Sequence, residues 1–235
     1  MNSNRPIHEG FTIGHRVAGR VAASAVFLLG VAYAVVTALG FLSLDSLQDP
    51  IGQPYVTVME LLIIPLAALY LVTMVAIHAY ARPEDKMYSL VALVFMTVLA
   101  AITTSVHFVI LTVGPRLHLT GESWVPLVVS FTWPSVVYAL DVLAWDWFFA
   151  LSLVFAAAVF RNGRLERAVR VLLLVSGILS LVGLFGVPLA DMQVRNIGVI
   201  GYAVVAPVAF LLIGVVFGRT HPEQEEIGRG LRSTT

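Results

Sequence analysis

The strongest constraint on the fold of this chain is a series of six apolar stretches, each long enough to cross a lipid bilayer as a helix. A hydrocarbon core of about 30 Å needs about 20 helical residues. Inside that core the backbone polar groups have no water to bond, so a spanning segment is a helix or part of a closed barrel. The expected helices cover residues 17–42, 56–81, 87–114, 134–160, 170–188 and 197–218. The sequence therefore predicts an all-α fold, a polytopic transmembrane helix bundle.

The composition agrees with this interpretation. Hydrophobic residues make up 59% of the chain and charged residues 12%, whereas an ordinary soluble domain has roughly 25% charged residues. The apolar stretches occupy most of the 235 residues, so we expect one integral membrane domain over residues 1–235, ending in a polar tail at 219–235. A formal net charge of zero gives no electrostatic reason to bind nucleic acid. The lack of cysteine excludes disulfides and thiol catalysis.

The basic residues predict how the bundle is oriented. Lys and Arg stay preferentially on the cytoplasmic side of a membrane. Of the 14 Lys and Arg residues, only Arg116 and Arg195 fall in connections expected on the opposite side. Both termini are therefore predicted to be cytoplasmic, in a multi-pass protein of the cell inner (plasma) membrane.

Counting along the expected helices places four ionisable side chains at one level near the outer boundary of the membrane. With a rise of about 1.5 Å per residue, Glu60, His107, Asp141 and Arg195 reach this level from four different helices. Asp146 should lie about 7 to 8 Å deeper. A carboxylate at such depth costs about 2.5 to 3.5 kcal/mol unless it faces a partner, water or the protein interior. We therefore expect a polar pocket facing outward, with Arg195 as the cation of its carboxylates.

Helical phase predicts which side chains line this pocket. Tyr138, Asp141 and Trp145 follow one stripe of their helix, whereas Asp146 is expected about 140° round from Asp141. The two carboxylates are therefore not expected to share a face. The expected ligand contacts are Glu60, His107, Tyr138, Asp141, Trp145, Asp146 and Arg195. The candidates for acid–base chemistry are Asp146, His107 and Glu60.

Simpler interpretations stay open for each of these residues. Glu60, His107 and Asp141 can be wetted groups at the membrane boundary, where charges are tolerated. Asp146 can be satisfied by a hydrogen bond between helices, and the tryptophans beside it can belong to an interfacial aromatic belt. The segment "VPLVVSFTWP", residues 125–134, is expected on or in the outer leaflet, where it could cover the pocket.

Two classes of function fit the expected pocket, besides a purely structural role. The first is a binder, sensor, small transporter or partner subunit that takes a small cationic or amphipathic molecule, held by carboxylates and aromatic faces. The second is an intramembrane enzyme that uses carboxylate and histidine acid–base chemistry on a lipid or isoprenoid. No cofactor is predicted, and one histidine with carboxylates on separate helices is a poor zinc signature. The expected partners are membrane lipids, a small ligand, and a membrane-protein partner or a second copy of the chain.

Two stretches carry a family resemblance. "YALDVLAWDWFFALSLVFAAAVF" and "RNIGVIGYAVVAPVAFLLIG" resemble helices of small, uncharacterised bacterial polytopic membrane proteins grouped as domains of unknown function. The likeness covers the C-terminal half and implies a bacterial inner membrane, with no activity. No expected helix holds a lysine in its interior, which excludes a retinal Schiff base as in rhodopsins.

The orientation can be tested with fused topology reporters. Reporters placed after Arg164 and at the C-terminus should both read as cytoplasmic, and one placed within "GPRLHLTGE", residues 114–122, should read as external. The reverse pattern would invert the outward direction assigned to the pocket.

Overall fold

The computed structural model describes residues 10–44 and 51–220, which form helices and no strand. Six helical spans are long and apolar enough to cross a membrane, so the predicted fold class is confirmed. The first three are α1 (Ile13–Leu42), α2 (Tyr55–Tyr80), and η1 (Pro83–Asp85) with α3 (Lys86–Thr112). Two short helices follow, α4 (Gly114–His118) and α5 (Val125–Val129).

The last three spans are assembled from shorter helical segments. The fourth consists of α6 (Val136–Val142), η2 (Leu143–Phe149), α7 (Ala150–Ala156) and η3 (Ala157–Val159). The fifth consists of α8 (Gly163–Gly183) and η4 (Leu184–Gly186). The sixth consists of α9 (Met192–Val199), η5 (Ile200–Val205) and α10 (Ala206–Arg219).

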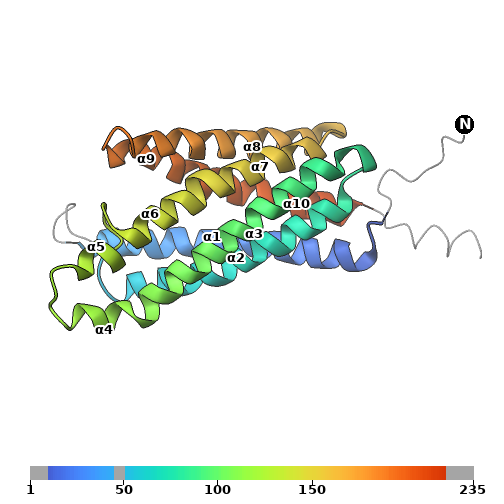
Figure 1. Ribbon diagram of the computed structural model, residues 1–235. Coiled ribbons are helices and arrows are strands. Elements are labelled where there is room, and N and C mark those ends of the chain that lie inside the picture. The colour runs from blue at the N-terminus through green and yellow to red at the C-terminus, as the bar shows by residue number, and fades with distance from the viewer. Residues whose placement is uncertain (1–9, 45–50, 221–235) are drawn as a thin grey trace, which may run out of the picture.

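The six spans close into a ring around an aromatic core. Successive spans pack against one another in chain order, and α10 completes the ring by packing between α8 and α1 (Figure 1). At the centre, the ring of Tyr70 contacts Trp145, Phe149 and Phe210 at centroid distances of 6.1, 5.1 and 4.6 Å. The fourth span is the most central, with 61% of its apolar window buried against 11% for α1.

Both ends of the described chain lie at the same end of the bundle. Arg16 near the start of α1 donates to the carbonyl of Gly218 near the end of α10, at 3.0 Å. The turns before α3 and α8 lie here too, and we call this the basic end. The helices α4 and α5 lie at the opposite end (Figure 1).

The fifth and sixth spans begin seven and five residues before the starts expected from the sequence, 170 and 197. In both cases a carboxylate binds backbone N–H groups at the start of the helix. Glu166 accepts from the backbone N–H groups of Arg161 and Asn162, and Asp191 accepts from the N–H of Gln193. Capping of this kind stabilises a helix start, so charged residues that resemble a loop belong to a helix.

Glycines let the fifth span approach its neighbours closely. A Cβ atom on Gly183 would lie 2.7 Å from the backbone of Gly198, and one on Gly177 would lie 2.8 Å from the carbonyl oxygen of Ala150. Small residues in contact of this kind are typical of packed transmembrane helices. Hydrogen bonds across helices add to the packing, because the hydroxyl of Ser176 donates to the carbonyl of Gly201 at 2.8 Å.

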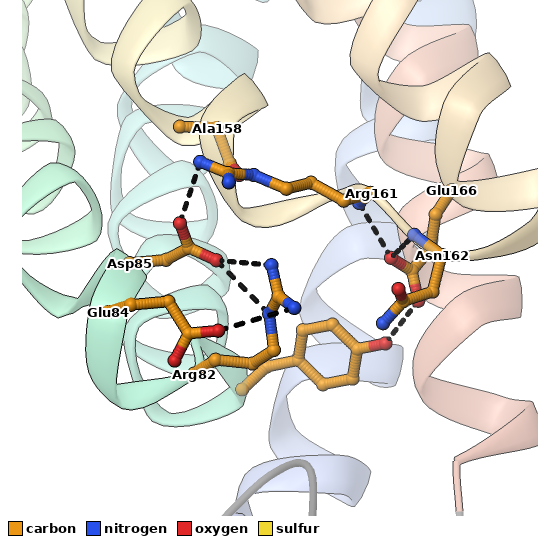
Figure 2. A network of polar contacts seen from close by, with 8 residues as sticks. Arg82, Glu84, Asp85, Ala158, Arg161, Asn162 and Glu166 are labelled. Carbon is orange, nitrogen blue, oxygen red and sulfur yellow. Dashed lines mark hydrogen bonds and ion pairs between the residues drawn. The ribbon is translucent and has the colours of Figure 1, made fainter.

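Charged groups join the two turns at the basic end. Asp85, which is buried, pairs with Arg82 at 3.0 Å and with Arg161 at 2.8 Å. Figure 2 shows Arg161 reaching from the turn before α8 to Asp85 in the turn before α3. Glu166 lies on the other side of Arg161, where its carboxylate accepts from the hydroxyl of Tyr80 at 2.7 Å. The network holds the third, fourth and fifth spans together at this end.

The close contact of Gly183 gives a test of the packing. Gly183→Ala should lower the free energy of unfolding by about 1 to 3 kcal/mol, because the new methyl group meets backbone that cannot yield. Gly218→Ala is the matched control, since its Cβ would have no neighbour closer than 3.6 Å. Thermal unfolding of both variants in detergent micelles measures the difference, and an unchanged Gly183→Ala protein would contradict the packing described.

Candidate functional site

Five charged or titratable side chains meet inside the bundle, near the end opposite the basic end. His107 of α3 lies between two carboxylates. Its Nδ1 is hydrogen-bonded to Glu60 of α2, and its Nε2 lies 3.5 Å from Asp141 of α6. Three helices are therefore joined through one imidazole.

Arg195 of α9 links Asp141 to the third carboxylate of the cluster. Its Nη2 lies 3.4 Å from Asp141, and its Nε lies 3.3 Å from Asp146 of η2. Its Nη1 donates to the hydroxyl of Tyr138 at 3.2 Å. We call Glu60, His107, Asp141, Asp146 and Arg195 the buried charge cluster.

A π turn explains why Asp141 and Asp146 share one cation. The expectation of about 140° between them assumes a regular α-helix, but residues Leu143–Phe149 form a π-helix. Since a π-helix bonds residue i to residue i+5, residues five apart lie nearer one face. The predicted separation of the two carboxylates is therefore wrong, and both contact the guanidinium of Arg195.

A glycine on the sixth span makes room for Asp146. A Cβ atom on Gly198 would lie 2.2 Å from Oδ1 of Asp146. Arg195, Gly198 and Tyr202 are spaced i, i+3 and i+7, so they share one face of the helix. Tyr202, in the second π segment, lies with its ring centre 5.9 Å from the guanidinium of Arg195. Gly198 and Tyr202 did not enter the expected site, but this spacing would have indicated them once the helix was started at Met192.

Aromatic side chains cover the cluster toward the nearer end of the bundle. Phe131, which follows α5, stacks on the ring of His107 with 5.5 Å between centroids. Phe131 and Trp133 both contact the ring of Tyr138 edge-on, at 5.9 and 6.2 Å. The segment expected to lie over the pocket thus lies over the histidine.

Trp145 takes a different place from the one expected. It is buried against Tyr70, Phe149 and Tyr202 in the aromatic core. Its charged neighbour in sequence, Asp146, points to Arg195 instead. The other tryptophan of the motif, Trp147, is 41% exposed on the outside of the bundle, where an interfacial residue is expected.

The cluster is closed and carries more acid than base. Its five members are 0 to 8% exposed, so none is a wetted surface group. The cluster has three carboxyl groups and one permanent cation. With all three acids ionised, its net charge is −2 if His107 is neutral and −1 if His107 is protonated. Three buried atoms of the cluster have no hydrogen bond within the described residues: His107 Nε2 and Asp141 Oδ1, which lie 3.5 Å apart, and Asp146 Oδ1. Such atoms are costly unless a donor or a proton satisfies them.

The cavities found in the described part of the structure lie beside the cluster or far from it. One, of about 340 Å³, is an apolar groove between α3 and α6, lined by Val106, Val109, Val137 and Leu140 among others. The other, of about 410 Å³, lies at the basic end. Among the described residues no three His, Cys, Asp or Glu side chains are grouped to hold a metal ion.

Comparisons of the chain with protein-family models, curated proteins and solved structures find no match.

Arg195 should be the most sensitive position of the cluster. Arg195→Gln leaves three buried carboxylates without a cation, and breaking a buried ion pair costs about 3 to 5 kcal/mol. Adding Asp146→Asn removes one of these charges, so the double variant should recover part of the loss. Unfolding in detergent measures both. Arg116→Gln, at an exposed arginine of α4, serves as control and should stay within about 0.5 kcal/mol of the parent.

Proposed function

We propose that this integral membrane protein is a non-enzymatic binder, sensor or small transporter that takes a small cation into the buried charge cluster. The excess of carboxyl groups over cationic groups in the cluster is the observation that carries the proposal. Three carboxylates are held near one arginine, and burial strengthens every charge interaction among them. A monovalent cation would bring the cluster close to neutrality. In this proposal the cluster faces outward in a bacterial inner membrane, with both termini cytoplasmic.

The unpaired acceptors favour a ligand that brings N–H donors. Asp146 has one buried oxygen, Oδ1, without a donor among the described residues, and the corresponding oxygen of Asp141 faces His107 Nε2 at 3.5 Å. A protonated amine carries three N–H groups and one charge, so it matches both the missing hydrogen bonds and the missing charge. The rings of Tyr138 and Tyr202 lie 4.9 and 5.9 Å from the guanidinium of Arg195, and their faces can add cation–π attraction.

Entry of such a cation requires the aromatic cover to move. Phe131 lies on the histidine, in a short segment between α5 and α6. A proton needs no such opening, so the empty cluster can hold a proton that an amine then displaces. The amine should therefore bind less tightly as the pH falls.

The apolar groove favours a second candidate, an intramembrane enzyme acting on a lipid or isoprenoid. Val106 and Leu140 line the groove and immediately precede His107 and Asp141 in the chain. His107 and Asp141 themselves do not line the groove. A hydrocarbon chain lying there would have to reach between α3 and α6 to meet the imidazole, which the two carboxylates orient as in a general acid–base pair. Turnover of an added lipid or isoprenoid by the purified protein would support this candidate.

Asp146 separates these functions from a purely structural role. Butylammonium should raise the thermal unfolding temperature of the purified protein, whereas butanol, its neutral counterpart, should not. Asp146→Asn keeps the shape of the side chain but removes its charge, so the affinity for butylammonium should fall about 10- to 100-fold, as expected for a lost charged hydrogen bond. The variant should still fold.

The control is Glu122→Gln, which removes an exposed carboxylate near the same end of the bundle and should leave binding unchanged. Mass spectrometry of the parent protein will identify any ligand retained during purification. Equal affinity for butylammonium in the parent and in Asp146→Asn would refute a cation site at the cluster. Chemical conversion of an added lipid would favour the enzyme.

A further inference from the structure

The basic end holds a second concentration of charge, of the opposite sign to the buried charge cluster. Its described residues include nine Lys and Arg side chains and three carboxylates, those of Glu84, Asp85 and Glu166. The formal net charge of these described residues is therefore positive.

The carboxylates are committed to the network that joins the turns. Glu84 pairs with Arg82 at 3.3 Å, and Asp85 pairs with Arg82 and Arg161 at 3.0 and 2.8 Å. Glu166 accepts from the Tyr80 hydroxyl at 2.7 Å and from two backbone N–H groups at 2.7 and 2.9 Å. Figure 2 shows Arg161 between the two groups of contacts, with its guanidinium on Asp85 and its backbone N–H on Glu166. The carboxylates of the network have ion pairs or hydrogen bonds elsewhere, so they leave other arginines uncompensated.

Two arginines from different helices face a cavity beside this network. The cavity has a volume of about 410 Å³ and lies between the start of α8 and the end of α10. Arg164 and Arg219 line it, together with Asn162, Gly163 and Thr220. Both guanidinium groups are exposed, and neither has a hydrogen-bond or ion-pair partner within residues 10–44 and 51–220.

The chemistry of this cavity matches a phosphate group. Guanidinium groups bind phosphate oxygens through paired N–H donors, and their hydrogen bonds are strengthened by charge. The cavity lies where two membrane spans begin and end, which is the level of lipid headgroups. Basic recesses between spans at this level are suited to anionic headgroups. Glu166 also lines the cavity, but its oxygens already accept three hydrogen bonds, and the two arginines outnumber its single charge.

We propose that the cavity between the start of α8 and the end of α10 binds the phosphate of an anionic molecule, the headgroup of a phospholipid such as phosphatidylglycerol, between Arg164 and Arg219. This site is separate from the buried charge cluster, at the other end of the bundle. Its occupant would join the fifth and sixth spans where they meet the membrane surface. The proposal does not depend on the cation-binding function.

The test compares two double variants with the same loss of charge. Arg164→Gln/Arg219→Gln removes the cavity arginines, and Arg167→Gln/Arg170→Gln removes two exposed arginines of the same helix that do not line the cavity. Each full-length protein is placed in nanodiscs of phosphatidylcholine with or without phosphatidylglycerol. Native mass spectrometry then measures which lipid is retained.

The parent protein should retain phosphatidylglycerol over phosphatidylcholine. The cavity variant should lose this preference by about tenfold or more, as expected for two arginines at a charged membrane surface, while the control variant keeps most of it. An equal loss in both variants would overturn the proposal, because it would indicate general attraction to a basic surface. Retention of both lipids alike by the parent would overturn it too.

A soluble competitor distinguishes the two sources of phosphate. Glycerol 3-phosphate is added to the protein in a neutral detergent, and thermal unfolding is followed. Stabilisation of the parent that is absent from the cavity variant supports the site with a soluble phosphate compound as occupant. Selective lipid retention without such stabilisation supports the site with the phospholipid as occupant.

Discussion

The guanidinium of Arg195, shared between Asp141 and Asp146, is the interaction around which the opposite end of the bundle is organised. A buried carboxylate without a cation is strongly unfavourable, and the cluster contains three of them. The Nε and Nη2 atoms of this arginine, on the sixth span, contact two different acids of the fourth span, so the arginine holds the two spans together. His107 extends the same relation to the second and third spans. Without that cation, burial of the acids would oppose assembly of the bundle.

Two departures from regular α-helix make the arrangement possible. The π segments η2 and η5 lie on the two spans that Arg195 joins, and both contribute side chains beside its guanidinium. π turns are rare and occur frequently at functional sites. The arrangement also requires close packing, which the glycines of α8 and α9 allow. Gly198 leaves space for a carboxylate oxygen of Asp146. The π segments thus orient the side chains around Arg195, and the glycines let the helices come close enough for these side chains to meet.

The number of spans could be predicted because hydropathy and length decide it, and the common level of Glu60, His107, Asp141 and Arg195 follows from the helical rise alone. The contact of both Asp141 and Asp146 with one arginine could not be predicted, because a π turn has no hydrophobic period of its own. The starts of the last two spans were missed since Glu166 and Asp191 are polar, as loop residues are. The stripe that carries Trp145 gives no indication of which side of the helix faces the core, so the packing of Trp145 against Tyr70 and Phe149 could not be predicted.

The π turn at η2 places a surplus residue beside Asp146, within the span that carries two acids of the cluster. A π turn contains one more residue than an α turn, and this surplus residue can occupy a different position along a helix without lengthening the span. Moving it toward the basic end, past Asp146, would rotate this carboxylate away from Arg195 and leave Asp141 in place. Shifts of helix register take place in microseconds to milliseconds. Such a shift would convert the observed arrangement, with both acids on the arginine, into one with a single acid there, by the passage of one peptide unit.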